Sequence, residues 1–271
     1  MFEILSKKEL APSIIEYEIF APNVARHAKA GQFIILIVDE LGERIPFTIA
    51  KYDREKHSIT ISVQTVGYST QKLAMLKQGD CLHDFVGPLG NPTELDEYKK
   101  IMLVAGGIGS AVISPQAIEL KEKGKDFDAI IGARNEELLL YRDVFDKTAT
   151  GVFYMTDDGS FGEKGFVTQK LEEKLAGGGY DLVFAVGPLR MMQAVCGVAK
   201  KYNVKSIVSM NSLMVDGTGM CGGCRVTVGG KTKYACVDGP EFDGDEIDFE
   251  EALSRSQTYA SQEQEHKCRL R

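Results

Sequence analysis

The first hundred residues alternate between short apolar runs and turns that contain glycine or proline. Runs of this length, rich in β-branched and aromatic residues, predict β-strands at 2–10, 14–21, 32–38, 47–53, 58–66 and 80–87. Only residues 69–76 have a helical pattern in this part of the chain. Many short strands with turn-rich connections are typical of a small antiparallel barrel, and we expect one over residues 1–98.

From residue 99 the pattern becomes an apolar run followed by an amphipathic stretch, repeated along the chain. The apolar runs predict strands at 100–107, 127–133, 151–156, 180–187 and 205–210. The stretches between them predict helices at 112–124, 135–145, 167–178 and 189–202. Strands that alternate with helices indicate a parallel sheet covered by helices, so an α/β domain is expected over residues 99–210.

After residue 210 the chain changes again, to a segment rich in glycine and cysteine at 216–239. Seven of the eleven residues from 241 to 251 are acidic. We interpret this acidic stretch as a solvated face, with a docking rim for a partner as the alternative. Residues 211–250 are predicted to form a small C-terminal module. The polar residues 251–271 are expected to form a surface helix or a frayed tail.

Length and charge exclude several classes of function. The 271 residues fit about two domains of ~100–200 residues each. A net charge of −7 argues against nucleic acid as a partner, because no general basic field attracts phosphates. No apolar run approaches the ~18–20 residues of a membrane span, and the N-terminal residues lack the apolar region of a signal peptide. A cytoplasmic protein that does not enter membranes is expected.

Three of the six cysteines lie with an aspartate in one glycine-rich segment, as Asp216-x4-Cys221-x2-Cys224-x11-Cys236. In a reducing compartment such clustering favours a metal site over disulfides. Three thiolates and one carboxylate supply the four anionic ligands of a 2Fe-2S cluster, and the glycines let backbone N–H groups approach its sulfides. The alternative is a zinc knuckle with the same four ligands. Three cysteines have no visible partner: Cys81, Cys196 and Cys268.

Two short motifs in the barrel are suited to a diphosphate. An arginine fork beside a hydroxyl occurs in the segment 44–48, and a Gly-x-Ser-Thr turn at 67–70 presents N–H groups at a helix N-terminus. Taken alone, Arg44 is equally well explained as a surface ion pair and Thr48 as an ordinary strand residue. Their joint occurrence in a barrel that precedes an α/β domain favours a flavin. The candidate flavin-binding residues are Arg44, Pro46, Phe47, Thr48, Gly67, Ser69 and Thr70.

Two glycine-containing turns follow predicted strands of the α/β domain, at 105–109 and at 187–188. Ligands of open α/β sheets bind at the carboxyl ends of the strands, although such turns are often only tight connections. Asp157 also follows a strand and is placed to meet ribose hydroxyls, with a capping turn as the alternative. No basic cluster accompanies it, which favours NAD over NADP, while Arg134 keeps NADP open. The candidate nucleotide-binding residues are Gly106, Gly107, Gly109, Asp157, Gly187 and Pro188.

Together these motifs resemble the ferredoxin reductase-like flavoproteins that carry a cluster module at the C-terminus, over about residues 1–250. The electron-transfer subunit of dihydroorotate dehydrogenase is similar in order, but its cluster uses four cysteines. Here Asp216 takes the first position. The pattern is therefore more similar to the small (alpha) subunit of NADH-dependent reduced ferredoxin:NADP+ oxidoreductase, also called sulfide dehydrogenase beta subunit. One departure is Val112, where the family's glycine turn commonly ends in proline.

The resemblance implies FAD in the barrel, NAD(H) on the α/β domain and a 2Fe-2S cluster held by Asp216, Cys221, Cys224 and Cys236. NADH gives up two electrons at once and the cluster carries one, so flavin is the converter and no catalytic acid or base is required. The resemblance further implies a larger flavoprotein subunit with 4Fe-4S clusters, where reduced ferredoxin and NADPH react by electron bifurcation. Two alternatives remain: the dihydroorotate dehydrogenase subunit, and a zinc-stabilised binding module without redox chemistry.

Overall fold

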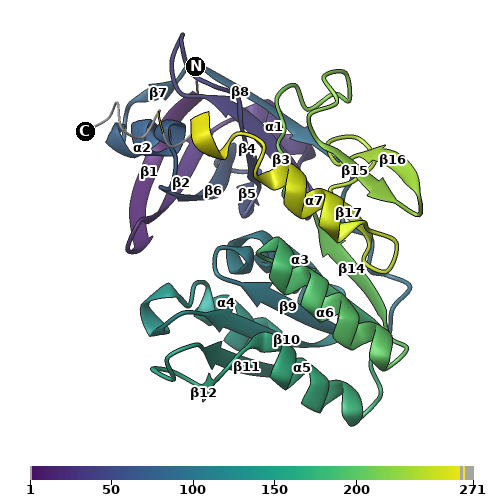
Figure 1. The fold of residues 1–271 in the computed structure, drawn as a ribbon. Coiled ribbons are helices and arrows are strands. Elements are labelled where there is room, and N and C mark those ends of the chain that lie inside the picture. The colour runs from purple at the N-terminus through teal and green to yellow at the C-terminus, as the bar shows by residue number, and fades with distance from the viewer. Residues whose placement is uncertain (1, 263–264, 266–271) are drawn as a thin grey trace.

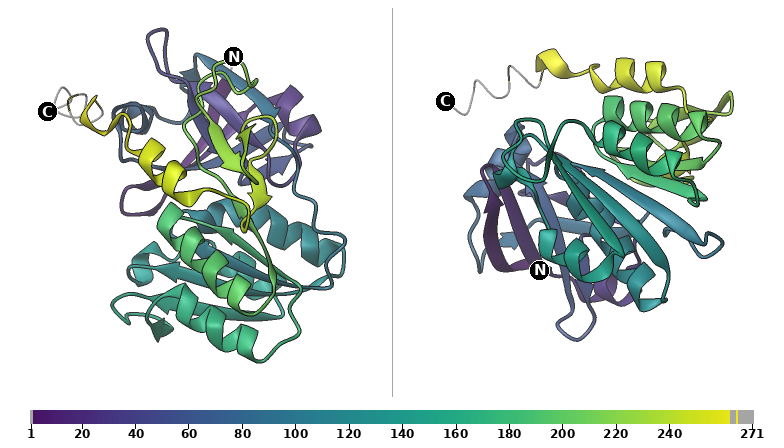
Figure 2. Two further views of the ribbon diagram at one scale, coloured as in Figure 1. Left: turned by 45° about the vertical axis from the view of Figure 1, so that its right-hand side comes forward. Right: turned by 90° about the horizontal axis from the view of Figure 1, so that it is seen from below.

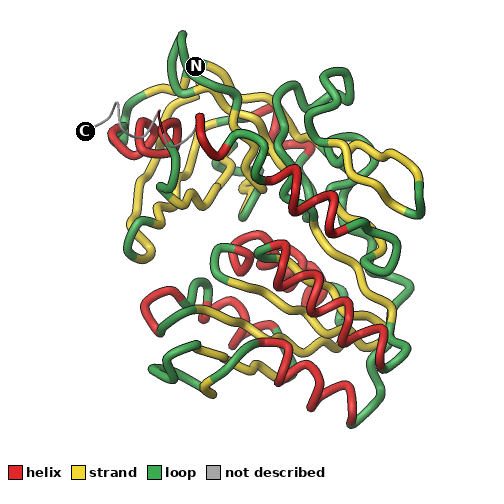
Figure 3. Tube along the Cα trace, in the orientation of Figure 1, coloured by secondary structure: helices red, strands yellow, loops and turns green. Residues whose placement is uncertain are grey.

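The computed structural model describes residues 2–262 and 265 and consists of three parts in chain order (Figure 1). A β-rich N-terminal part lies above a layered α/β part, and a hairpin flanked by the cysteine loops, with a C-terminal helix, lies beside both. Loops connect these parts, as Figure 3 shows. Within the described residues, no helix is long enough and apolar enough to span a membrane.

The N-terminal part is built from two antiparallel sheets, with strand orders β5-β6-β2-β1-β7 and β4-β3-β8. Their inward-facing side chains, among them Ile4, Tyr17, Ile34 and Ile59, are almost completely buried in one core. Both sheets therefore close over one core, as expected for the predicted barrel. The strands are β1 (Phe2–Ala11), β2 (Ile14–Phe20), β3 (Phe33–Ile37), β4 (Ile45–Thr48), β5 (Lys51–Asp53), β6 (Ser58–Gln64), β7 (Cys81–Leu82) and β8 (Asp84–Leu89).

Two helices, α1 (Pro22–His27) and α2 (Tyr68–Met75), interrupt these strands. The expectation of a single helix in this part was wrong, because α1 is too short to show a helical period. Pro22 occupies the first turn of α1, where proline fits the helical backbone, and Val24 and Ala25 are buried against the barrel core. Tertiary packing thus stabilises a helix that the local pattern does not reveal.

The α/β part is one seven-stranded sheet with the order β12-β11-β10-β9-β13-β14-β17, in which only β17 runs antiparallel to its neighbour. Side chains alternate between its two faces. Met102 and Val104 pack under α5 and α6, whereas Ile101 and Leu103 pack under α3 and α4. The strands are β9 (Lys100–Gly106), β10 (Asp126–Ala133), β11 (Gly151–Thr156), β12 (Glu163–Lys164), β13 (Leu182–Val186) and β14 (Lys205–Ser209). The helices are α3 (Gly109–Glu122), α4 (Arg142–Thr148), α5 (Val167–Ala176) and α6 (Leu189–Lys201).

The helix predicted at 135–145 is broken into a short 3-10 turn, η1 (Glu136–Leu138), and α4. Between them Tyr141 adopts a left-handed conformation with φ of 57°. Its hydroxyl donates to Glu16 Oε2 at 2.5 Å, and Leu140 packs with Ile14 of the same barrel hairpin. Leu138, Leu140 and Tyr141 therefore contact the barrel, whereas Leu139 and Phe145 are buried in the core of the α/β part.

The C-terminal part consists of the hairpin β15 (Arg225–Val228) and β16 (Lys231–Tyr234), the edge strand β17 (Glu241–Asp243) and the helix α7 (Phe249–Ser256). The acidic stretch is thus not simply a solvated face: β17 completes the sheet with Phe242 buried, and Phe249 anchors α7. Figure 2 shows α7 lying alongside α6 in both views. Of the predicted tail, residues up to 256 are helical.

Candidate functional site

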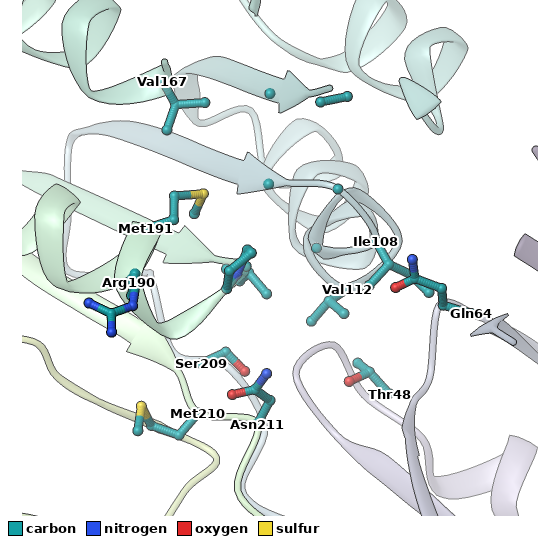
Figure 4. A pocket seen from close by; sticks show the side chains of 18 of the residues that line it. Thr48, Gln64, Ile108, Val112, Val167, Arg190, Met191, Ser209, Met210 and Asn211 are labelled. Carbon is teal, nitrogen blue, oxygen red and sulfur yellow. The ribbon is translucent and has the colours of Figure 1, made fainter. Parts of the chain in front are cut away.

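A cavity of about 1000 Å³ lies between the barrel and the carboxyl ends of the sheet strands. In Figure 4, Thr48 and Gln64 mark its barrel side, and Arg190 and Met191 mark the side formed by α6. Its size and largely apolar walls suit a cofactor of several rings. Nine of the residues singled out in the sequence line it: Pro46, Phe47, Thr48, Gly106, Gly107, Gly109, Asp157, Gly187 and Pro188.

The first glycine turn serves two structural needs between β9 and α3. Gly107 has φ of 57°, and a Cβ placed there would meet nothing within 4 Å. At Gly109, by contrast, a Cβ would lie 2.3 Å from the carbonyl oxygen of Val186. Gly109 therefore allows α3 to approach β13 closely, and Gly107 leaves open space in front of a helix N-terminus. That space is where an anionic group would be favoured.

The second turn, Gly187-Pro188, leads from β13 into α6. A Cβ on Gly187 would lie 2.7 Å from Cε of Met191, and one on Gly106 would lie 2.4 Å from the Sδ of the same side chain. Met191 thus fills the space between the two turns and forms part of the cavity wall. The two turns and this side chain make one continuous surface at the carboxyl edge of the sheet.

The other four predicted flavin-binding residues do not line this cavity. Gly67 and Thr70 form the cap of α2, where the Gly67 N–H donates to Thr70 Oγ1 at 2.9 Å. The Ser69 hydroxyl donates to Glu43 Oε2 at 2.5 Å, and Glu43 immediately precedes Arg44. The structure therefore brings Arg44, Gly67, Ser69 and Thr70 together around the loop between β3 and β4, beside the barrel end of the cavity.

Two of the three cysteines of the segment 216–239 lie side by side, and the third lies on the surface. Cys224 and Cys236 are buried, and their Sγ atoms lie 3.2 Å apart. Cys221 is exposed, and its Sγ accepts the N–H of Gly223 at 3.4 Å. Burial, with the neighbouring Cys224 thiol, raises the pKa of Cys236, so binding of a metal would have to displace a proton.

Asp216 closes the loop in front of these cysteines. Its Oδ1 accepts the N–H of Thr218 at 3.0 Å, and its Oδ2 accepts the N–H groups of Met220 at 3.1 Å and Cys221 at 2.8 Å. The Thr218 amide is the largest of the influences that hold the pKa of Asp216 below its usual range. The side chain is therefore a carboxylate anion in the folded protein, available to a cation as a hard oxygen ligand.

The donor set fits an iron-sulfur site in its chemistry. Within the described residues, no three side chains of the metal-binding types converge as a site for a single ion. The segment 216–236 nevertheless carries three thiols and one carboxylate, and the N–H of Cys236 lies 3.5 Å from the Sγ of Cys224. Backbone donors directed at sulfur are the surroundings that a sulfide cluster needs. Of the remaining cysteines, Cys81 is exposed, Cys196 is buried, and Cys268 lies outside the described residues.

The cavity wall continues directly into the cysteine loop. Ser209, Asn211 and Met214 line the cavity, and Asp216 follows two residues later. Met214 also packs in the same core as Cys224 and Cys236. A cofactor in the cavity and a cluster on the loop would therefore share one continuous stretch of chain.

Several cavity residues carried no signal in the sequence that marks them as part of a site. Gln64 ends an ordinary strand, and Phe166 lies in a loop with 65% of its surface exposed. Arg190 and Asn211 become neighbours of the glycine turns only through the fold. Arg134, the residue that keeps NADP open as an alternative, lines the cavity, as does Asp157.

Comparison with known proteins agrees with this arrangement. Residues 103–197 match the model of the oxidoreductase NAD-binding domain, and residues 211–248 match the iron-sulfur cluster binding domain of dihydroorotate dehydrogenase B. A Thermotoga maritima protein named dihydroorotate dehydrogenase B (NAD(+)), electron transfer subunit homolog is 43% identical, over 96% of this chain and 92% of that one. An uncharacterized Clostridium beijerinckii protein is 47% identical, over 97% and 92%.

Solved structures show the same kinship. A chain of the NADH-dependent reduced ferredoxin-NADP oxidoreductase, studied for flavin-based electron bifurcation, matches with a TM-score of 0.94 and 41% identity, over 100% of this chain and 98% of that one. Phthalate dioxygenase reductase, at 20% identity and a TM-score of 0.61, shares the fold. These matches confirm the resemblance and the fold class expected from the sequence. The chain belongs to the family of dihydroorotate dehydrogenase B-type electron-transfer subunits, oxidoreductase subunits in which a ferredoxin reductase-like fold carries an NAD-binding domain and an iron-sulfur domain.

Proposed function

We propose that this chain is the NAD(H)-linked small subunit of a bifurcating ferredoxin:NADP+ transhydrogenase, carrying FAD and a 2Fe-2S cluster. The observation that supports this most directly is the cavity whose wall contains both glycine turns and the barrel residues 46–48 and then continues into the cysteine loop. The likeness of the whole chain to a subunit of the bifurcating oxidoreductase supports the same function. In this proposal residues 1–98 bind FAD, residues 99–210 bind NAD(H) and residues 211–250 hold the cluster. Residues 251–271 form a C-terminal tail.

In this proposal the barrel and the sheet hold two flat cofactors against each other. Pro46, Phe47 and Thr48 contact the flavin, and Arg44 with the Gly67–Thr70 turn binds its diphosphate. Gly106, Gly107, Gly109, Gly187 and Pro188 line the nicotinamide nucleotide, with Asp157 near a ribose. When bound, FAD supplies the conversion between hydride transfer and single-electron transfer. The chain itself positions the rings and excludes water, so no side chain has to act as an acid or base.

The cluster ligands are proposed to be Asp216, Cys221, Cys224 and Cys236. Cys221 is the exposed member of the set, and several exposed apolar residues lie near it in the chain or on the same loop. Met220 is 88% exposed, and Leu213, Val215 and Val237 are about half exposed. An exposed apolar surface around a redox site suits contact with another protein. We propose that the larger flavoprotein subunit, with its 4Fe-4S clusters, exchanges electrons here and is itself the site where reduced ferredoxin and NADPH react.

A second function is favoured by a different observation. The family model for residues 211–248 and the Thermotoga relative both carry the name of dihydroorotate dehydrogenase B. In that case the partner would be an FMN-containing barrel enzyme. Co-purification distinguishes the two: a flavoprotein with 4Fe-4S clusters supports the transhydrogenase, and a dihydroorotate-oxidising enzyme supports the alternative.

The cofactor content tests the proposal before any partner is known. The protein is purified without oxygen and assayed for flavin, iron, acid-labile sulfide and zinc. We expect one FAD, with about two irons and two sulfides per chain. Stoichiometric zinc in a colourless, flavin-free protein would contradict the proposal and would favour a zinc-stabilised binding module that keeps the fold.

A further inference from the structure

Two arginines hold the turn between Cys221 and Cys224 from the outside. Nη2 of Arg255 donates to the carbonyl oxygen of Gly223 at 2.9 Å, and Nη1 of Arg225 lies 3.4 Å from that of Gly222. Arg225 is exposed and adjacent to a cysteine, whereas Arg255 reaches the turn from α7, 32 residues away in the chain. Arg255 also lies beyond the residues that match the iron-sulfur domain model.

The helix that carries Arg255 is firmly placed. Phe249 in its first turn is buried, and the Asp248 carboxylate caps the helix by accepting the N–H of Glu251 at 2.9 Å. The same helix packs against α6 and β15. Arg255 is the basic residue in its last turn and is partly buried. Its guanidinium is therefore held at the turn by a fixed element.

Both polar groups of Gly223 are occupied by this arrangement. Its N–H is directed at the Sγ of Cys221 at 3.4 Å, and its carbonyl accepts from Arg255. The bond to Arg255 fixes the orientation of the peptide between Gly223 and Cys224, and hence the direction in which the turn presents its donors. A hydrogen bond to a charged donor is about twice as strong as a neutral one.

The charge of Arg255 matters as much as its hydrogen bond. An iron-sulfur site with three thiolates and a carboxylate carries net negative charge, and one added electron increases it. A nearby guanidinium stabilises the more negative, reduced state and so raises the reduction potential. Net charge and hydrogen bonding around the sulfurs are the properties through which a protein adjusts that potential.

We propose that Arg255 is a positioning residue for the iron-sulfur site, which fixes the Cys221–Cys224 turn through the Gly223 carbonyl and favours the reduced cluster through its charge. This inference rests on the proposed function, since it requires the cluster. It assigns to α7, outside the cysteine segment, a part in setting the direction of electron transfer.

The test is an anaerobic redox titration of the whole protein with dithionite, which donates the electron, followed by the visible and electron paramagnetic resonance signals of the cluster. Three variants separate charge from geometry: Arg255→Lys keeps the charge, Arg255→Gln keeps a hydrogen-bond donor, and Arg255→Ala keeps neither. Lys200→Ala removes an equal charge from the exposed end of α6 and is the control. Cluster loss in the presence of a chelator is measured in parallel.

At a fixed solution potential, we expect Arg255→Gln and Arg255→Ala to lower the ratio of reduced to oxidised cluster about threefold to tenfold. Arg255→Lys should stay within about twofold of the wild type, and Lys200→Ala should not differ from it. Arg255→Ala should also lose its iron fastest. If Arg255→Ala does not retain a cluster on purification, the reduction potentials of Arg255→Gln and Arg255→Lys test the inference.

Equal potentials in the wild type, Arg255→Gln and Arg255→Lys would overturn the inference, as would a shift of the same size in Lys200→Ala. A wild-type protein that holds neither iron nor sulfide would overturn the proposed function together with this inference. A wild-type cluster that ignores the Arg255 substitutions would overturn the inference alone.

Discussion

The Nε–H of Arg44 donates to the main-chain carbonyl of Val215 at 2.6 Å, which joins two residues that are 171 positions apart. Arg44 precedes β4 of the barrel, and Val215 immediately precedes Asp216 of the cysteine loop. Arg44, which we propose binds the flavin diphosphate, therefore also anchors the cysteine loop through a hydrogen bond. The bond uses one of the five N–H donors of a guanidinium, so a phosphate and a carbonyl can share the same side chain.

Replacing Arg44 should weaken flavin binding. Arg44→Ala removes a charge-assisted contact worth about 1.5–3 kcal/mol, so we expect the affinity for FAD to fall at least about tenfold. Fluorescence titration of the flavin-free protein with FAD measures the change. Arg54→Ala is a matched control, since Arg54 likewise donates to a main-chain carbonyl, that of Ala28 in the N-terminal part, at 3.2 Å. Wild-type affinity in Arg44→Ala would show that the diphosphate lies elsewhere.

Because the space in front of Gly107 is open, we expect replacement of this glycine by alanine to weaken nucleotide binding selectively. Gly107→Ala places a methyl group in the cavity and forces a left-handed alanine, at about 1–2 kcal/mol of strain. Gly124 has nearly the same backbone, with φ of 66°, and its added Cβ would also meet nothing within 4 Å, but it lies outside the cavity lining. Both variants should lose similar stability, and only Gly107→Ala should raise the Kd for NADH, by about tenfold or more. Equal NADH affinity in the two would remove Gly107 from the site.

Asp216 can be tested for its role as a ligand separately from its role in the loop. Asp216→Ala removes both the carboxylate and the acceptor for three amides, and we expect a loss of iron and sulfide. Asp216→Cys supplies a thiolate and should retain the cluster with a changed visible spectrum. Iron, sulfide and spectrum that are all unchanged in Asp216→Ala would exclude the carboxylate from the ligand set.

Because of Glu241, we expect the free energy of unfolding to fall as the pH rises. Its Oε1 accepts the Thr93 hydroxyl at 2.5 Å, and burial raises the pKa of this carboxyl to about 7 in the folded chain. Because the folded-state pKa lies above the unfolded value, the protonated form stabilises the fold below pH ~4.5. This contribution, up to about 3 kcal/mol, is lost as the pH rises through 7. Glu241→Gln stays neutral, so its free energy of unfolding should change less between pH 5.5 and 8 than that of the wild type. Urea denaturation at the two pH values measures this, and an equally large change in both proteins would contradict the assignment.

Much of this fold is visible in the sequence because local and tertiary requirements agree. The run 100–107 is apolar because the strand is buried on both faces, and a glycine turn follows it where α3 starts. The glycine turns singled out in the sequence line the cavity at the carboxyl edge of the sheet. Val112, in place of the family's proline, does not disturb α3, which starts at Gly109.

The remaining features depend on contacts between distant segments. Phe242 is the only apolar residue of the segment 241–243, and this segment becomes a strand only by pairing with β14. Leu140 belongs to the contact with the barrel, which the helical pattern at 135–145 conceals. Arg255 meets Gly223 only because α7 packs against β15. None of these neighbours is encoded in a local motif.

The most direct test of the proposed electron path is anaerobic stopped-flow mixing of the purified holoprotein with NADH or NADPH. Visible absorbance follows the flavin, and freeze-quenched paramagnetic resonance follows the cluster. The account predicts that NADH bleaches the flavin much faster than NADPH does and that the reduced cluster then appears in the same protein. A flavin reduced equally fast by both nucleotides would contradict the preference for NAD. If NADH does not reduce first the flavin and then the cluster, the central claim that one chain transfers electrons from NADH through flavin to the cluster is contradicted.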